Sequence, residues 1–330
     1  MKKIDFSIKT LVSVMLTLIV IFYLLGVYWS VTPDEFDIEA EVIKDASVEN
    51  VTPVIGYSTT TALIRVTETL LNKSGGYLSN DALPPSVFLD NMPAWEFGVL
   101  EMVRDLSLGM RKEFSRSQSQ SIEDVFLKKA HPQFNIDHKS WAIPSAENEY
   151  NQGVKELYAY RKALSDTESP SQFYARTDNL RDWINAVGKR LGSYSQRLSA
   201  SVGREQINND LAGDSAAQQS NFSSSLIELK TSWWQIDNEF YEARGACWAL
   251  LHFLKAIEID FNEVLIRKNA KISVQQIIRE LEASQQSVWS PMILNGSGFG
   301  LLANHSLVMA NYISRANAAL IDLNDLLSQG

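Results

Sequence analysis

Residues 226–264 read LIELKTSWWQIDNEFYEARGACWALLHFLKAIEIDFNEV, and this stretch decides the fold class. Its apolar residues recur at alternating steps of three and four, the spacing that lines one face of an α-helix. These positions are Leu226, Leu229, Trp233, Ile236, Phe240, Ala243, Cys247, Leu250, Leu254, Ile257, Phe261 and Val264. A second row of Ile227, Trp234, Tyr241 and Trp248 makes the face wider than a two-stranded coiled coil needs. The stretch therefore predicts a helix of about 40 residues, roughly 60 Å long, buried on more than one side.

The same periodicity recurs elsewhere in the chain. Residues 173–198 repeat it behind Ser169-Pro170, and proline suits the first turn of a helix. Residues 309–327 repeat it again near the end of the chain. Shorter helices are expected at 58–72, 93–115, 121–132, 145–165 and from Ser273, with Ser121, Ser145 and Ser273 as caps. Together these segments predict an all-α fold, a long antiparallel helical bundle.

Two segments interrupt the helical pattern. Residues 203–224 are rich in Asn, Ser, Gln, Gly and Ala, which is typical of a flexible connection. Residues 289–303 read WSPMILNGSGFGLLA and are expected to form an apolar loop that contains glycine. The NGSGFG sequence within it lacks the lysine and the preceding strand of a phosphate-binding loop.

Residues 8–29 predict a transmembrane signal anchor. The apolar run from Ile8 to Tyr28 carries only Lys9 as a charge, and its 21 residues at 1.5 Å each span about 30 Å, the thickness of the hydrocarbon core. Tyr23, Tyr28 and Trp29 gather where an aromatic belt would lie. A cleaved signal peptide is the alternative, but its apolar core would be about 7–15 residues long and would precede small residues.

Charges on the two sides of the span predict its orientation. Three lysines lie at positions 2, 3 and 9, whereas acidic residues follow the span. The positive-inside rule then gives a single-pass protein with a cytoplasmic tail at 1–7 and a C-terminal domain outside the cytoplasm, which in a bacterium means in the periplasm. Residues 30–54 are expected to be an acidic spacer, because apolar and acidic residues alternate over 36–42 as in an extended segment. Residues 55–330 then form the helical domain.

Composition argues against a nucleic-acid partner. The chain has 30 basic and 39 acidic residues, and residues 31–330 hold 27 and 38 of these, a net charge of -11. Such a surface repels phosphate backbones. The single cysteine, Cys247, excludes an intramolecular disulfide, so the fold must depend on packing.

The histidines and the cysteine carry no recognisable chemistry. His131, His138 and Asp137 could approach a metal ion, but their spacing matches no metal-binding signature. His252 and Cys247 fall on the apolar faces of the long helix and are interpreted as core residues. We therefore predict no metal site and no cofactor, and no catalytic residue is assigned.

The segment 75–98 is the most unusual, because it mixes turn-forming and acidic residues with large apolar ones. One interpretation is a recognition surface; the other is a lid that closes one end of the bundle. The residues proposed for binding are Tyr77, Asn80, Asp81, Phe88, Asp90, Asn91, Trp95 and Glu96.

Residues 75–106, GGYLSNDALPPSVFLDNMPAWEFGVLEMVRDL, resemble a proteobacterial family of single-span inner-membrane proteins, domain of unknown function 2333. The resemblance extends over most of the chain. It implies a Gram-negative envelope location and brings no activity, cofactor or catalytic residue.

The leading functional hypothesis is a non-enzymatic envelope scaffold or interaction protein, held in the membrane by residues 8–29. Its partner would be an envelope protein or another envelope component, and a homo-oligomer is possible. The alternative is an envelope hydrolase acting on cell wall or lipid, with Asp81, Asp90 and Glu96 as its carboxylates. A cleft at 75–98 with converging carboxylates would favour the enzyme, whereas an exposed apolar patch would favour a partner site.

Overall fold

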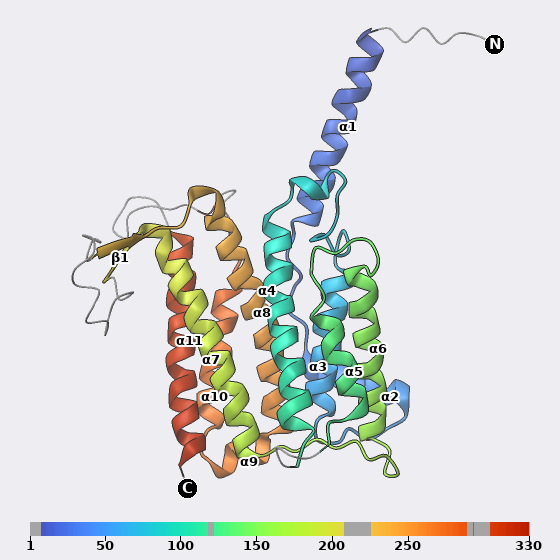
Figure 1. Ribbon diagram of the computed structural model, residues 1–330, viewed down its shortest axis with the longest axis vertical. Helices are drawn as coiled ribbons and strands as arrows, with labels where there is room; N and C mark the ends of the chain where they lie inside the picture. Colours follow the sequence, from blue (N-terminus) through green and yellow to red (C-terminus); the bar gives the residue numbers. More distant parts are fainter. Residues whose placement is uncertain (1–7, 118–121, 208–225, 289–292, 294–303, 330) are drawn as a thin grey trace, which may run out of the picture.

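A computed structural model of the chain describes residues 8–117, 122–207, 226–288, 293 and 304–329. The helices form an elongated body, and α1 projects from one of its ends, called here the α1 end (Figure 1). The elements are α1 (Ile8–Trp29), α2 (Ile38–Glu49), α3 (Tyr57–Asn72), η1 (Ser86–Phe88), α4 (Asn91–Gly109), η2 (Met110–Phe114, π-helical), α5 (Val125–Phe134), α6 (Ala146–Leu164), α7 (Thr177–Ser199), η3 (Ala200–Val202), β1 (Arg204–Ile207), β2 (Leu226–Leu229), η5 (Trp233–Gln235), α8 (Ile236–Asp260), α9 (Asn262–Arg267), α10 (Lys271–Ser284) and α11 (His305–Ser328). The predicted all-α bundle is confirmed, and within the described ranges it is joined by one small antiparallel strand pair, β1–β2.

Helices α4 and α8 form the centre of the body. Helices α3, α5 and α6 pack on one side of this pair, and α7, α10 and α11 pack on the other (Figure 1). Most neighbouring helices run antiparallel, as predicted, but α4 and α8 run parallel. Gly98 near the start of α4 meets Glu242 near the start of α8, and the Phe114 ring just beyond α4 lies 5.2 Å from that of Phe261 just beyond α8.

The predicted 40-residue helix is wrong over its first ten residues, 226–235. Residues 226–229 form β2, which pairs with β1, and α8 begins only at Ile236. The backbone N–H of Thr231 donates to the Ala200 carbonyl at 3.0 Å, which draws the chain away from a helical path. From Ile236 onward, the predicted inward positions up to Val264 are buried, although the helix breaks at Phe261 and continues as α9.

Four predicted helix starts have mixed outcomes. Ser145 caps α6 as predicted, and its side chain accepts the N–H of Asn148. At α5 the cap is Asp124, and the helix continues through Pro132 to Phe134. Helix α10 starts at Lys271, ahead of the predicted cap Ser273. The helix expected from Ser169-Pro170 starts at Thr177 instead.

Residues 170–176 are not helical, and the side chain of Phe173 among them packs into the core. Its ring lies 5.3 Å from Phe114 and 5.7 Å from Phe261. It also packs on Gly56, where any Cβ atom would collide with the ring. The N–H of Tyr174 donates to the Phe114 carbonyl at 2.6 Å, so backbone pairing with another element replaces the first helical turns.

Two of the interrupting segments lie largely outside the described residues. Of the predicted flexible connection 203–224, residues 204–207 form β1 and 208–225 are not described. Of the predicted apolar loop 289–303, only Ile293 is described, and it is buried.

The predicted extended spacer is wrong, because residues 38–49 form the helix α2. Asp37 caps it by accepting the N–H groups of Glu39 and Ala40. Ile38, Val42 and Ala46 are buried, at the spacing of four that lines one helix face. The alternation over 36–42 therefore marks the junction of an extended segment with a helix.

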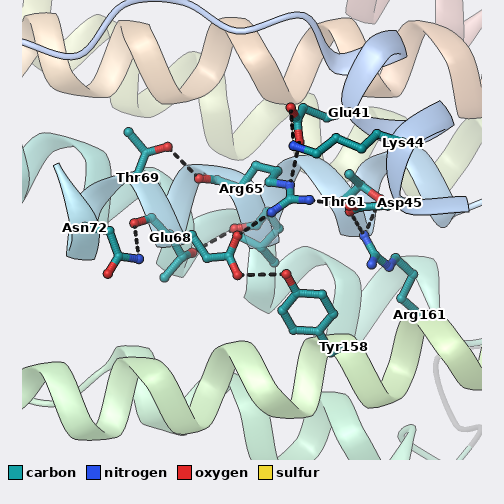
Figure 2. Close-up of polar contacts among 12 residues, drawn as sticks. Glu41, Lys44, Asp45, Thr61, Arg65, Glu68, Thr69, Asn72, Tyr158 and Arg161 are labelled. Atoms are coloured by element: carbon teal, nitrogen blue, oxygen red, sulfur yellow. Dashed lines mark hydrogen bonds and ion pairs between the residues drawn. The ribbon is translucent and has the colours of Figure 1, made fainter. Parts of the chain in front are cut away.

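Helix α2 is clamped to the body by two arginines (Figure 2). Arg161 of α6 lies 2.5 Å from Asp45 and 2.6 Å from Glu49, and its side chain is 1% exposed. Arg65 of α3 pairs with Asp45 on the other side and with Glu41 at 3.0 Å. Three of the acidic residues that suggested a solvated spacer thus pair with one buried and one half-buried arginine.

His252 holds the chain that leads into α2. Its Nε2 accepts the N–H of Phe36 at 3.1 Å, and its Nδ1 donates to the Trp248 carbonyl at 2.7 Å. The Phe36 ring stacks on the imidazole with centroids 3.9 Å apart. The interpretation of His252 as a satisfied core residue is confirmed by these contacts.

We expect stability to fall as the pH drops from about 6.5 to about 4, because of His252. Burial lowers the pKa of His252 to about 4, while the unfolded chain binds its proton near the ordinary value of about 6.5. Between these values only the unfolded state is protonated, so acidification removes about 3 kcal/mol of stability. His252→Gln, which keeps an acceptor but cannot titrate, should flatten this loss in urea unfolding measured at each pH. Equal losses in the two proteins would contradict the assignment.

Candidate functional site

The last turn of α1 packs against the segment 75–90. A Cβ atom at Gly26 would lie 3.6 Å from Leu89 and 3.9 Å from Pro85, both ordinary contacts. The Trp29 ring covers Gly75, whose φ of +85° and lack of a Cβ atom allow this approach. The segment singled out in the sequence therefore surrounds the base of α1 (Figure 1).

The start of this segment is held in place by a buried ion pair between Lys73 and Glu96. The Glu96 carboxylate accepts the N–H groups of Leu78 and Ser79, each at 2.8 Å, and the Ser79 hydroxyl at 2.5 Å. Lys73 Nζ lies 2.5 Å from Glu96, and both side chains are buried. Burial raises the pKa of Glu96, while Lys73 and the hydrogen-bond donors oppose that effect. Glu96 thus orders the segment and offers no oxygen to a substrate.

Three more of the predicted binding residues, Trp95, Tyr77 and Asn80, serve packing and anchoring. Trp95 is fully buried, 5.2 Å from the Trp248 ring. The Tyr77 hydroxyl donates to the His138 carbonyl at 3.1 Å. Asn80 donates to the Ser140 carbonyl and to Glu147. Asn91 is half-buried in the first turn of α4.

The other three predicted residues lie at the surface. Phe88 is 78% exposed, and Asp81 and Asp90 are also exposed. The segment thus has two parts: residues 77–80, together with Trp95 and Glu96, close the end of the bundle, whereas residues 81–90 form a tip with exposed side chains.

A shallow groove of about 420 Å³ runs beside this tip, between the segment 78–97, residues 138–139 and the start of α8. Two of its three carboxylates are engaged in separate contacts. Asp81 accepts the Ser86 hydroxyl at 2.8 Å, and Glu242 lies 2.5 Å from Arg197. Burial, followed by the charge of Asp90, raises the pKa of the nearby Asp237. Asp81 and Glu242 are thus not paired with each other, whereas Asp90 and Asp237 lie close enough for their charges to interact.

The remaining candidates for chemistry lie apart. His131 Nδ1 is 3.0 Å from the Ser107 hydroxyl, whereas the His138 ring packs on Phe97. Burial raises the pKa of Cys247 to about 12. In the part of the chain that the structure describes, no three His, Cys, Asp or Glu side chains come together as a metal site.

Sequence reasoning missed the exposed apolar residues around the tip. Leu83 is 75% exposed, and Val87 is also exposed. Trp233 and Trp234, assigned above to the helix seam, lie in η5 with their side chains exposed. The Pro84-Pro85 pair beside Leu83 was the available signal, because it prevents a regular element from burying its neighbours.

Fold and site together define a helical-bundle protein that carries one solvent-exposed apolar helix at its N-terminal side. Among the described residues, α1 is the helix long and apolar enough to cross a membrane, by length and composition. The chain belongs to the bacterial family described as uncharacterised conserved proteins, domain of unknown function 2333, whose profile matches residues 2–330. Searches of the curated proteins and of the solved structures returned no match.

Proposed function

We propose that this protein is a single-pass protein of the bacterial inner membrane that holds a helical interaction body on the periplasmic face. The observation that carries the proposal is the packing of α1. Its apolar side chains are exposed from Ile8 to Tyr28, as a lipid-facing helix requires, while Gly26 and Trp29 in its last turn contact the body. A signal sequence removed by cleavage would have no need of that contact.

The body would be held at the membrane without a flexible linker. Seven residues after α1, Phe36 is stacked on His252, and α2 is then clamped by Arg65 and Arg161. A rigid connection gives the body a fixed orientation relative to the bilayer. This suits a scaffold that presents one surface to an envelope component.

The carboxylates favour this role over the hydrolase. A glycoside hydrolase needs two carboxyl groups that face one substrate, one of them with a raised pKa. Glu96 has a raised pKa but is buried in an ion pair with Lys73, Asp81 accepts the Ser86 hydroxyl, and Asp90 is exposed at the surface. The segment 75–98 therefore supports a docking surface better than a catalytic centre.

A reporter fused after Gly330 tests the topology. A phosphatase that folds only in the periplasm is expected to be active there, and a reporter that needs the cytoplasm is expected to be silent. The reverse pattern would contradict the orientation. Crosslinking of the same full-length chain in intact membranes would then separate a second copy of this chain from another envelope component as the partner.

A further inference from the structure

The exposed aromatic side chains of the body gather at the α1 end. Outside α1, those whose exposure the structure describes are Phe88, Trp141, Trp233 and Trp234. Trp234 is 82% exposed. Aromatic residues are concentrated at membrane–water interfaces, where their rings lie at the level of the lipid headgroups.

Contacts place three segments at this end. Phe88 precedes Leu89, which packs on Gly26 of α1. Trp141 follows Ser140, whose carbonyl is bonded to the segment 75–90 through Asn80. The two tryptophans of η5 immediately precede α8, and α8 and α4 both begin at the α1 end (Figure 1). The start of α8 also lines the groove beside the tip.

The length of α1 sets the height of the tip relative to a bilayer. From Ile8 to Gly26 the helix rises about 27 Å at 1.5 Å per residue. The hydrocarbon core is about 30 Å thick, so the level of Gly26 lies close to its outer boundary. Because Pro85 and Leu89 contact Gly26, the tip between them lies at that boundary too.

We propose that Leu83, Val87, Phe88, Trp233 and Trp234 insert into the lipid interface on the side where α1 leaves the bilayer. They would form a second membrane contact beside the anchor, with lipid acyl chains and headgroups as the partner. The inference rests on the proposed function, because it needs α1 in the membrane. It deepens that function by fixing which end of the body faces the lipid.

Lipid fits this surface because the surface continues the apolar surface of α1. Leu, Val, Phe and Trp are the residues that amphipathic elements bury about 5–10 Å into the interface. The two charged residues within the segment 75–90, Asp81 and Asp90, are acidic, so the attraction is apolar and should not weaken as salt screens charges. Lys139 and Lys230 are exposed at this end, and their stems can extend to the headgroups.

Single cysteines in the full-length chain test the contact, since the native Cys247 is fully buried and does not compete for a label. An environment-sensitive fluorophore is attached to the cysteine of the Phe88→Cys and Trp234→Cys variants, and each labelled protein is inserted into phosphatidylcholine vesicles. Ile272→Cys is the matched control, because Ile272 is 75% exposed at the start of α10, at the opposite end of the body. Leu18→Cys, in the middle of α1, reports on the anchor.

The fluorescence emission of the labels at 88 and 234 is expected to shift to the blue and to be quenched by lipids brominated near the headgroup. High salt should change neither effect. The label at 272 should be quenched by aqueous iodide alone. Iodide quenching at 88 and 234 as strong as at 272, with position 18 quenched by lipid, would overturn this inference and leave the anchor intact. A label at position 18 that lipid does not quench would overturn the anchor and this inference together.

Discussion

Gly245→Ala is expected to destabilise the protein by about 3 kcal/mol or more, since an added methyl group has no space between α8 and α4. A Cβ atom at Gly245 would lie 2.9 Å from the backbone carbon of Trp95 and still closer to its carbonyl oxygen. Gly98→Ala should behave alike, because its Cβ atom would lie 2.9 Å from the backbone nitrogen of Ala246. Backbone atoms cannot rotate away as side chains can, so the central helix pair must separate.

The measurement is urea unfolding of the full-length chain in detergent, followed by circular dichroism. Gly192→Ala in α7 is the control, because the nearest atom to its Cβ position, on Asn317, is 3.8 Å away. Alanine is the better helix former by up to about 1 kcal/mol, so this control should be neutral or more stable than the wild type. If Gly245→Ala were as stable as Gly192→Ala, α4 and α8 could not be in backbone contact.

Arg161→Met is expected to cost about 3–5 kcal/mol, the range for breaking a buried ion pair by removing one partner. Methionine keeps much of the side-chain volume but leaves Glu49 without its arginine and Asp45 with Arg65 alone. The ring of Tyr57, which lies 4.8 Å from the guanidinium, also loses its cationic neighbour. Hydrogen exchange should show that α2 loses protection first.

Lys44→Met supplies the comparison for Arg161→Met. Lys44 pairs with Glu41 of the same helix at 3.2 Å, but its side chain is 64% exposed. Exposed pairs contribute about 0–1 kcal/mol, so unfolding should change little. Similar effects of the two substitutions would show that α2 is not held by Arg161.

Periodic helices could be predicted from the sequence alone. In α11 the positions Met309, Ile313, Ala316, Leu320 and Leu327 are buried as predicted. In α7 the predicted inward positions from Leu180 to Leu198 are buried as well. The apolar spacing of a helix is a local property, so residues within one turn of each other are enough to reveal it.

Element ends were less predictable, because distant backbone groups decide them. The spacing of residues 226–229 suits a helix, yet they pair with residues 204–207. Phe173 suits a helix seam, yet it fills the space over Gly56. In each case a tertiary contact outweighs a local preference of a few tenths of a kcal/mol per residue.

In the candidate site, too, local sequence indicated the segment, and tertiary contacts decided which of its residues are buried. Composition marked residues 75–98 as unusual, but it could not separate the buried Glu96 and Trp95 from the exposed Phe88. That division depends on Lys73, which supplies the countercharge for Glu96, and on α1, which covers Gly75.

The sequence by itself determined the helical class, the single apolar helix at residues 8–29 and the family. Each follows from hydropathy or residue pattern, which can be read along the chain without knowing its path. Only the tertiary structure decided that residues 38–49 of the predicted acidic spacer form a docked helix. Asp45 forms an ion pair with Arg161, which is 116 residues away in the sequence. Because the partner lies so far along the chain, local sequence cannot distinguish this buried charge from a solvated one.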